Sequence, residues 1–390
     1  MIRKFPIIRP AVTLRDIGQA IFVNWDTSAD KFVEYITSQT NKKFVYLSDS
    51  GLAAFYLALV ALKSSSERRE VVIPAYTAGS LVVAVKKAGL KPVLVDISLE
   101  DFNLDCRLLA GAISHNTLAV VAVHMFGIPI HDSAALKTMI PPEVCFIEDC
   151  CQAQGGRVND LAVGSFGQIS FFSFNRGKNF SVLGGGAIAT DNEALAGEIG
   201  KTLRHSPEYR VFQEFGLGEK MCFSVMGTNP YIYNWVNSLA AGFKENAPPD
   251  DFTVKRLSGL GTALGTVLMR KSADFFSARN RNGEYLFNRL KYLPGLRLAE
   301  IKPDIYPVYN RFPVLFETEE NLEKKQNKLW RAGFESSRMY LSPLHKMFRL
   351  GYLPQDFPQA NYFAQHLLTL PVYPALGEKE LSRMIKILQS

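Results

Sequence analysis

The chain has 390 residues, of which 47% are hydrophobic, so it is long and apolar enough for one large domain or for two to three ordinary ones. This composition excludes disorder as the main state. Lys and Arg number 44 against 37 for Asp and Glu, a net charge of +7. The basic residues are scattered, which argues against nucleic-acid binding. The excess fits a phosphorylated or carboxylated substrate, an anionic membrane surface, or ordinary solubilising charge.

The cysteines and the N-terminal segment bear on localisation. The cysteines are Cys106, Cys145, Cys150, Cys151 and Cys222. An odd number at these spacings matches neither a disulfide framework nor a CxxC metal motif, and it favours a reducing compartment. The N-terminal segment has no apolar run of signal-peptide length before Pro10 and Arg15. We therefore expect a cytoplasmic protein without a metal site.

Short β-branched apolar runs alternate with helical stretches from residue 43 to residue 190, as in a parallel sheet covered by helices. The runs that predict strands are Lys43–Leu47, Glu70–Ile73, Pro92–Val95, Leu118–Val123, Val144–Glu148, Gln168–Ser173 and Ala187–Thr190. Several are almost continuously apolar, which is typical of strands buried on both faces. Amphipathic segments at Leu52–Leu62 and Ala78–Ala88 predict helices between them. The sequence therefore predicts a large α/β domain.

The pattern changes after residue 204. Glu208–Asp251 is rich in aromatic residues and glycine and lacks clean periodicity, so we interpret it as an insertion. The segments that follow are the helical Arg256–Arg289, then Tyr309–Phe316, the helical Glu319–Ala332 and the terminal helix Lys379–Leu388. We expect a large domain over 1–255, with the insertion at about 208–251, and a linking helix with a smaller C-terminal α/β domain over 256–390.

The stretch from residue 144 to residue 190 carries the residues with chemical meaning. Asp149 ends a predicted strand, at the edge where parallel sheets bind ligands. Lys178 follows another strand and precedes the glycines 184–186. Singly, such an Asp is usually a turn former and such a Lys a surface charge. Together they match a pyridoxal phosphate enzyme, which needs a lysine amine for the cofactor aldehyde and an acid that keeps the pyridine nitrogen protonated.

The phosphate of such a cofactor needs hydroxyls and backbone N–H groups, which a helix N-terminus presents well. Ser50 and Gly51 come directly before the helix predicted from Leu52. Ser173 ends the strand that precedes Lys178 and is placed to reach the same phosphate. The set of residues is chemically coherent.

A series of motifs along the chain resembles the DegT/StrS sugar aminotransferases. In order they are DSGLAAFYLAL, VVIPAYTAGSLVVAV with GLKPVLVDI, AVVAVHMFGIPI, IEDCCQAQGG, FFSFNRGKN followed by LGGGAIATD, RLSGLGTALG and HLLTLPVYPAL. Each motif is weak alone, but the ordered series is highly specific and covers nearly the whole chain except Glu208–Asp251. The resemblance implies a fold-type I pyridoxal phosphate transferase: a large, mostly parallel sheet with helices on both faces, and a smaller C-terminal α/β domain.

The resemblance also implies the cofactor site. By motif, the residues that bind pyridoxal phosphate are Ser50, Gly51, Leu52, Asp149, Gln152, Ser173 and Lys178. Lys178 matches the catalytic Schiff-base lysine, Asp149 the partner of the pyridinium nitrogen, and Gln152 the glutamine near the phenolic oxygen. Ser173 matches the phosphate-binding serine. The match is imperfect at Leu52, where the family commonly has a threonine.

Other positions depart from the family pattern or rest on analogy. Ala78 stands where an aromatic residue usually stacks on the cofactor ring, and we expect Tyr76 to take that role. Fold analogy places Arg311, Tyr340 and His345 at the substrate. His124 also lies at a strand end, where a satisfied structural histidine is the more frequent finding.

The resemblance implies an aminotransferase that acts by a ping-pong mechanism, with glutamate as the expected amino donor and a keto sugar, nucleotide-linked or related, as the acceptor. Such sugars are used in cell-surface polysaccharides. One alternative is a deoxysugar dehydratase of the same family, although there the lysine is replaced by histidine. The other is a cofactor-binding regulatory or membrane-associated protein without turnover. We expect a homodimer with active sites built from both chains, Thr253–Arg256 being the element that reaches the partner.

Met221–Phe243 is a charge-free, aromatic-rich stretch flanked by Lys220 and Lys244. Its length suffices for a membrane span of about 20 residues, but its hydroxyl and amide side chains argue against one. Aromatic rings between lysines suit the membrane interface, so the stretch indicates a peripheral contact with the inner membrane surface or with a lipid-linked substrate. A lid over the active site or a dimer element explains it at least as well.

Overall fold

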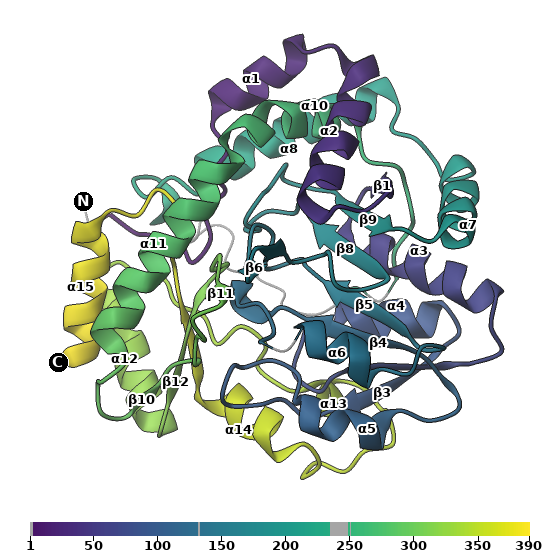
Figure 1. Ribbon diagram of the computed structural model, residues 1–390. Helices are drawn as coiled ribbons and strands as arrows, with labels where there is room; N and C mark the ends of the chain where they lie inside the picture. Colours follow the sequence, from purple (N-terminus) through teal and green to yellow (C-terminus); the bar gives the residue numbers. More distant parts are fainter. Residues whose placement is uncertain (1–2, 132, 235–248, 250) are drawn as a thin grey trace.

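The computed structural model describes residues 3–131, 133–234, 249 and 251–390 (Figure 1). Its centre is a seven-stranded sheet with the order β1-β9-β8-β5-β4-β2-β3. The strands are β1 (Phe44–Ser48), β2 (Glu70–Pro74), β3 (Lys91–Val95), β4 (Thr117–Val123), β5 (Cys145–Asp149), β8 (Ile169–Ser173) and β9 (Gly186–Thr190). All are parallel except β9, which is antiparallel to both of its neighbours. The seven predicted strands are confirmed within one residue at each end.

Alternate residues of the central strands enter different cores, which explains their unbroken apolar runs. Val71 and Ile73 of β2 pack into one cluster, whereas Val72 packs into another on the opposite face. In β8, Phe171 and Phe172 divide in the same way. Both faces of the sheet therefore need a layer of helices.

The helices supply these two layers. One face is covered by α3 (Gly51–Ser64), α4 (Ser80–Lys87) and α7 (Glu193–Arg204). The other is covered by α1 (Leu14–Phe22), α2 (Trp25–Thr40) and α10 (Gly259–Leu268) near β1 and β9, and by α5 (Leu109–Ala112) and α6 (Ser133–Met139) toward β3. The α/β fold with a large, mostly parallel sheet is thus confirmed.

A second, smaller sheet follows in the C-terminal part of the chain. Its antiparallel strands are β10 (Leu296–Arg297), β12 (Phe312–Phe316) and β13 (Leu367–Leu370). The helices of this part are α11 (Ser272–Leu290), α12 (Glu319–Arg331), α13 (Leu344–Met347), α14 (Pro358–His366) and α15 (Glu378–Gln389). A third sheet of β6 (Arg157–Val158), β7 (Leu161–Ala162) and β11 (Ile305–Tyr306) joins a segment after β5 to the C-terminal part. Figure 1 shows α11 running between the two main sheets.

Two sequence-based interpretations need correction. The helix predicted over Arg256–Arg289 is two helices, α10 and α11, separated by a 3-10 turn at Met269–Lys271. The segment interpreted as lacking periodicity contains α8 (Val211–Gly227), a helix of 17 residues. Met221 is the one residue of α8 that is buried. Because α8 has no broad face against the core, its apolar residues do not fall on one stripe, and the helical period was lost.

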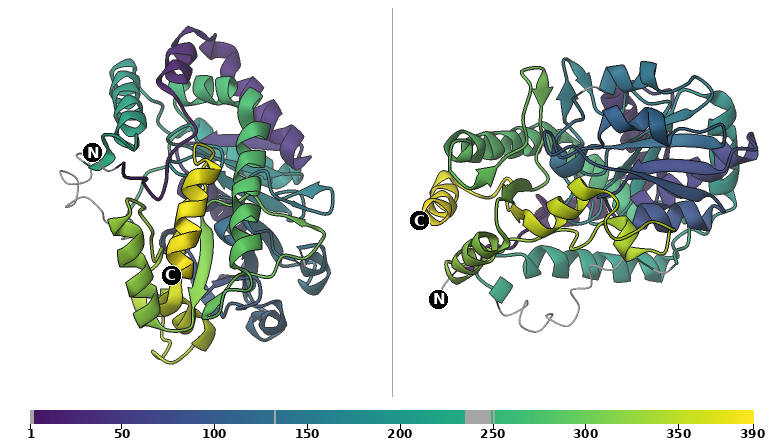
Figure 2. Two further views of the ribbon diagram at one scale, coloured as in Figure 1. Left: turned by 90° about the vertical axis from the view of Figure 1, so that its left-hand side faces the viewer. Right: turned by 90° about the horizontal axis from the view of Figure 1, so that it is seen from below.

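Helix α8 lies along the outside of the molecule in both views of Figure 2. It follows α7 in the chain and passes the N-terminal segment before the chain reaches α10. The backbone N–H of Lys4 donates to the carbonyl of Pro230, just beyond α8, at 3.1 Å. Residues 235–248, which hold most of the rest of the aromatic stretch, lie outside the described part of the chain.

Candidate active site

The carboxyl ends of the parallel strands meet at one edge of the large sheet, and this edge carries the predicted site. Asp149 is the last residue of β5 and Ser173 the last residue of β8. Tyr76 follows β2 by two residues, and His124 follows β4 directly. Four predicted positions from distant parts of the sequence therefore share one edge because the strands run in the same direction.

Lys178 lies in the loop between β8 and β9, and its neighbour Asn179 fixes this loop. Asn179 is buried, and its Nδ2 donates to the backbone oxygens of Gln152 at 2.9 Å and Val308 at 2.6 Å. Because Gln152 lies three residues after Asp149, these bonds tie the lysine loop to the end of β5. The backbone around the lysine amine is thus held in place.

A second anchor comes from α11 and the segment before β12. Asn310 Nδ2 donates to the carbonyl of Gly177 at 2.6 Å. Arg279 Nη1 donates to the carbonyl of Asn310 at 3.2 Å, and its Nη2 lies 3.5 Å from the carbonyl of Lys178. Burial lowers the pKa of Arg279 to about 10. A buried cation held by carbonyls at this point positions the loop without contacting a substrate.

Asp149 is buried at the end of β5, and its Oδ1 accepts the N–H of Cys151 at 2.9 Å. Burial raises the pKa of Asp149, while the bond to Cys151 and the positive charge of Lys178 act in the opposite direction. A cationic ring nitrogen placed against this carboxyl stabilises its anion in the same way. The positive charge of Lys178 thus acts on the Asp149 carboxyl.

The turn before α3 forms a compact phosphate-binding geometry. Ser50 caps the helix, since its Oγ accepts the N–H of Ala53 at 3.1 Å and its carbonyl accepts the N–H of Ala54 at 3.0 Å. The first turn of α3, at Gly51 and Leu52, is where a helix presents backbone N–H groups to an anion. The missing hydroxyl at Leu52 thus leaves backbone donors in place.

The close approach of three segments at this turn requires glycine. A Cβ on Gly51 would lie 2.7 Å from the Cβ of Ser173 and 3.2 Å from the Sγ of Cys151. A Cβ on Gly186 of β9 would lie 2.5 Å from the backbone nitrogen of Gly51. The structure thus brings Ser50, Gly51 and Ser173 together.

These residues fit pyridoxal phosphate. Helix N–H groups and the Ser173 hydroxyl are donors for a phosphate, Asp149 is a buried carboxyl for a ring nitrogen, and Lys178 is an amine for an aldehyde. The close approach of Gly51 to Ser173 brings the N-terminus of α3 and the Ser173 side chain to one place.

Gln152 and Tyr340 connect this cluster to the C-terminal part of the chain. Gln152 is buried, and its Oε1 accepts the N–H of Phe126 at 3.2 Å. Burial raises the pKa of the Tyr340 hydroxyl; the charge of Arg311 and a hydrogen bond to Gln152 oppose this shift, and the charge of Asp149 adds to it. Tyr340 therefore extends from the C-terminal part to the cluster around Asp149.

Tyr76 and Arg311 lie beside Tyr340. Tyr76 is fully buried, its hydroxyl donates to the carbonyl of Tyr340 at 3.1 Å, and its ring packs edge-on against Tyr340 and Phe363. Stacking of Tyr76 on a cofactor ring stays a prediction. The Nε of Arg311 is buried without a hydrogen-bond partner among the described residues. Burial lowers the pKa of Arg311, and the neighbouring Tyr340 and Glu335 oppose this shift.

His345, by contrast, is not brought to the cluster. It is buried in α13, where its Nε2 lies 3.4 Å from the carbonyl of Pro354 and its ring packs against Phe357. Burial lowers the pKa of His345. No described contact joins it to Asp149 or Lys178, so the geometry gives its predicted role at the substrate no support.

His124 is a satisfied structural histidine. Its Nδ1 accepts the N–H of Ile130 at 3.1 Å, so its Nε2 carries the proton and donates to Glu148 Oε1 at 3.1 Å. Glu148 also accepts the N–H groups of Gly164, Phe166 and Gly167. His124, Glu148 and Cys150 are close enough to hold a metal ion. The ring nitrogens of His124 and the carboxylate oxygens of Glu148, however, already form hydrogen bonds within the protein.

Asn179, Arg279 and Glu148 are the positioning residues that sequence reasoning missed. Asn179 and Glu148 lie inside the quoted motifs FFSFNRGKN and IEDCCQAQGG, directly beside Lys178 and Asp149. Their position next to Lys178 and Asp149 in the sequence could have identified them as candidate positioning residues. Nothing local marked Arg279, because it reaches the lysine loop from a helix about a hundred residues later.

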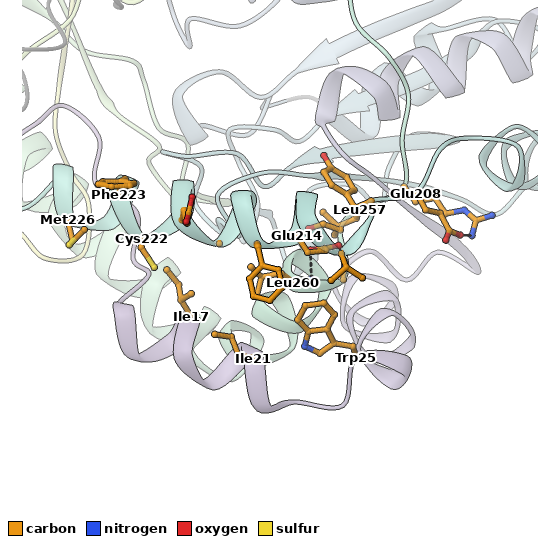
Figure 3. A pocket seen from close by; sticks show the side chains of 18 residues that line it. Ile17, Ile21, Trp25, Glu208, Glu214, Cys222, Phe223, Met226, Leu257 and Leu260 are labelled. Carbon is orange, nitrogen blue, oxygen red and sulfur yellow. Dashed lines mark hydrogen bonds and ion pairs between the residues drawn. The ribbon is translucent and has the colours of Figure 1, made fainter.

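A cavity of about 1090 Å³ lies away from this site, between α1, α8 and the start of α10. Figure 3 shows Ile17 and Ile21 of α1 facing α8, with Trp25 next to Leu260. The lining is largely apolar. We call this cavity, with the exposed side chains of α1 and α8 around it, the α1–α8 groove.

Comparisons with known proteins cover nearly the whole chain. The model of the DegT/DnrJ/EryC1/StrS aminotransferase family matches residues 14–389. The erythromycin biosynthesis sensory transduction protein EryC1 of Saccharopolyspora erythraea is 29% identical over 87% of this chain and 84% of its own. The dTDP-3-amino-3,4,6-trideoxy-alpha-D-glucose transaminase of Streptomyces venezuelae is 26% identical over 86% of this chain and 80% of its own.

A solved structure shows the same fold along the whole chain. The GDP-4-keto-6-deoxy-D-mannose-3-dehydratase of E. coli, with bound hydrated PLP, superposes with a TM-score of 0.78 at 18% identity, covering 100% of both chains.

Proposed function

The chain belongs to the DegT/DnrJ/EryC1/StrS aminotransferase family, and from this premise we propose that it is a pyridoxal phosphate-dependent sugar aminotransferase. It transfers an amino group from glutamate to the keto group of a nucleotide-linked or related sugar in two half-reactions. The observation that carries the proposal is the convergence of Lys178, Asp149, Ser173 and the Gly51 turn at one edge of the sheet.

Each residue has a role that its surroundings support. Pyridoxal phosphate, when bound, supplies an electron sink for proton shifts at the substrate carbon. The N–H groups of Gly51 and Leu52, with the Ser173 hydroxyl, bind the phosphate. The Asp149 carboxylate would keep a proton on the ring nitrogen, because a negative charge beside that nitrogen favours its cationic form. In each half-reaction the Lys178 amine would carry the proton between the substrate carbon and the cofactor.

The test of the reaction separates the two half-reactions. Glutamate should convert the absorbance of the bound aldehyde cofactor to that of its amine form, and a keto sugar from a panel of free, nucleotide-linked and lipid-linked compounds should reverse it. Lys178→Ala should abolish both changes. Borohydride reduction and peptide mapping should place the cofactor adduct on Lys178, and an adduct on another lysine would overturn the assignment.

The dehydratase alternative is disfavoured by Lys178, since the family's dehydratases carry histidine there, although a dehydratase shares the fold. A regulatory protein without turnover remains an outcome of the same assay. It would bind the cofactor but show no absorbance change with glutamate or any keto sugar.

The α1–α8 groove supports the homodimer as the assembly. Phe22, Phe215 and Phe223 are 90%, 74% and 70% exposed around it, which is unusual for a monomer surface. A helix with one buried residue gains little stability from its own chain, and a second copy would cover it. The segment Thr253–Arg256 lies beside its own phosphate turn, since the carbonyl of Lys255 accepts the N–H of Asp49 at 3.0 Å. Whether it also reaches a partner stays a prediction.

Light scattering tests the dimer. Phe215→Ser with Phe223→Ser should shift the protein to monomer, whereas Leu108→Ser, an exposed leucine elsewhere, should not. The indicated membrane contact through 221–243 is the competing use of this face. Glu208, Glu214 and Glu219 line the groove against one Arg256, which suits anionic lipid poorly. Co-sedimentation with anionic liposomes, lost on deletion of 221–243, would favour the membrane.

No helix in the described ranges is long and apolar enough to cross a membrane.

A further inference from the structure

The N-terminal segment of residues 3–9, which we call the strap, is fixed to the C-terminal part of the chain. Phe5 donates its N–H to the carbonyl of Gly333 at 2.7 Å, and its carbonyl accepts the N–H of Glu335 at 2.9 Å. The Phe5 ring is buried and stacks on the ring of Phe334, with centroids 5.1 Å apart. Backbone hydrogen bonds and a buried ring therefore define the position of the strap.

The Glu335 side chain joins the strap to the insertion. Its Oε2 accepts the N–H of Ile7 at 2.9 Å and the hydroxyl of Tyr233 at 2.5 Å. Tyr233 belongs to the segment after α8, and the N–H of Lys4 donates to the carbonyl of Pro230 in the same segment at 3.1 Å. Figure 2 shows the N-terminal segment beside the end of α8. One carboxylate thus connects the strap, the insertion and the C-terminal part.

The strap reaches the catalytic loop at Ile8. A Cβ on Gly177 would lie 2.9 Å from Ile8 Cδ1, 3.0 Å from its Cγ2 and 3.1 Å from its Cβ, so the Ile8 side chain lies directly on the backbone of this glycine. Gly177 has a φ of +87°, a conformation that favours glycine. Ile8 therefore covers the loop at a left-handed glycine, one residue before Lys178.

Gly177 is also held through its carbonyl. Asn310 Nδ2 donates to this carbonyl at 2.6 Å, and the N–H of Lys178 donates to the carbonyl of Asn175 at 3.1 Å. These bonds orient the peptide groups, but Gly177 has no side chain to pack, and the three atoms nearest to its missing Cβ all belong to Ile8. Ile8 also lines a cavity of about 390 Å³ between this loop and α8. Without Ile8 the loop would therefore have room to move on this side.

We propose that the strap is a positioning element of the reaction, in which Ile8 holds the catalytic loop and Glu335 holds the strap. The inference rests on the proposed aminotransferase function, because it concerns the loop that carries the reacting lysine. A misplacement of about 1 Å can lower turnover about a hundredfold. A loop packed by Ile8 keeps its backbone in place during both half-reactions. The end of the insertion then acts on the loop from a distance, through its bond to Glu335.

Hydrogen exchange of the cofactor-loaded protein, followed by mass spectrometry, tests the proposal without a substrate. In Ile8→Ala the peptide that spans 175–179 should exchange about fivefold faster, since the loss of one half-buried packing contact makes local opening easier. Ile8→Val keeps the Cβ and Cγ2 that face Gly177 and should restore most of the protection. Ile7→Ala is the matched control, because it keeps the backbone bond to Glu335 and should leave this peptide unchanged. The melting temperature of each variant checks the fold.

Glu335→Gln tests the other contact of the strap. An amide has one oxygen acceptor and weakens the bonds from Ile7 and Tyr233, so this variant should also speed the exchange of the 175–179 peptide. The double variant with Ile8→Ala should show less than the product of the two single effects, because both act through one element. An effect equal to that product would overturn the strap as a unit.

Steady-state kinetics separate positioning from folding. Ile8→Ala should lower kcat about tenfold and leave KM for glutamate within about a factor of two, whereas Ile7→Ala should stay close to wild type. Wild-type kcat in Ile8→Ala, equal exchange of the 175–179 peptide in wild type and Ile8→Ala, or equal changes in Ile8→Ala and Ile7→Ala would each overturn the proposal. Faster exchange in Ile8→Ala alone, in a protein that shows no half-reaction with glutamate or any keto sugar, would refute the proposed function and leave the contact of the strap with the loop standing.

Discussion

Asn179 donates a hydrogen bond of 2.9 Å to the carbonyl of Gln152, and this bond joins the catalytic loop to the strand end that carries Asp149. The same amide donates to the carbonyl of Val308 at 2.6 Å, so one buried side chain holds three segments. Lys178 precedes it by one residue. The position of the reacting amine thus depends on a residue that has no chemistry of its own.

Asn179→Ala should lower both stability and turnover. It leaves buried carbonyls without their donor, which costs about 1–3 kcal/mol of unfolding free energy. Turnover should fall further than stability explains, because the lysine loses its fixed loop. Urea unfolding and steady-state kinetics measure the two effects. Asn288→Ala, an exposed asparagine on α11, is the control. Wild-type turnover in Asn179→Ala would contradict the positioning role.

Asp149→Asn should preserve the fold and most cofactor binding but remove most of the activity. A neutral amide cannot hold a proton on the ring nitrogen, and we expect a loss of about a hundredfold or more in kcat, the scale of a lost acid–base group. Circular dichroism and cofactor absorbance check folding and occupancy. Asp160→Asn on the surface controls for the lost charge. Activity within a factor of two of wild type would sink the assigned role.

Much of the large sheet could be predicted because its signal is local. Strands such as β4 are buried at every position and apolar from Leu118 onward. The motifs around Asp149 and Lys178 are continuous in sequence. The cofactor residues share one sheet edge because parallel strands end together, which the alternating pattern already implied.

The parts that escaped prediction depend on contacts between distant segments. Arg279 reaches the lysine loop from α11, and no local pattern marks that reach. The sequence did not predict helix α8, because its apolar residues line separate cavities or are exposed and do not pack against one core. The role of His345 at the substrate stays a prediction from analogy; in α13 its ring packs against Phe357. Tyr340 is expected at the substrate by analogy, but its hydrogen bond with Gln152 was not predicted.

Glu148→Gln should destabilise the protein more than most surface changes. The buried Glu148 carboxylate accepts hydrogen bonds from the Nε2–H of His124 and from three backbone N–H groups. An amide has one oxygen acceptor fewer and brings an unmatched donor, so we expect a loss of about 3 kcal/mol. Urea unfolding measures it, with the more exposed Glu143→Gln as control. A change below about 0.5 kcal/mol, the scale of surface substitutions, would show that this network is dispensable.

Asp49→Asn should change how stability depends on pH. Burial raises the pKa of Asp49 from its ordinary 3.8 to about 6, against the opposing bond from the Lys255 N–H. The folded state therefore binds this proton more tightly than the unfolded state does. The resulting stabilisation is fully present below about pH 4 and is lost as the pH rises through about 6. Asparagine does not titrate, so the variant lacks this loss.

The comparison is made by urea unfolding at pH 4.5 and pH 7.5, two values of about a unit and a half on either side of the raised pKa. Relative to wild type, Asp49→Asn should gain on the order of 1 kcal/mol in unfolding free energy between the lower and the higher pH, a value reduced for the partial exposure of the carboxyl. Asp30→Asn on the exposed side of α2 controls for the loss of one negative charge. If the unfolding free energies of Asp49→Asn and wild type differ by the same amount at both pH values, the pKa of Asp49 is not raised in the folded state.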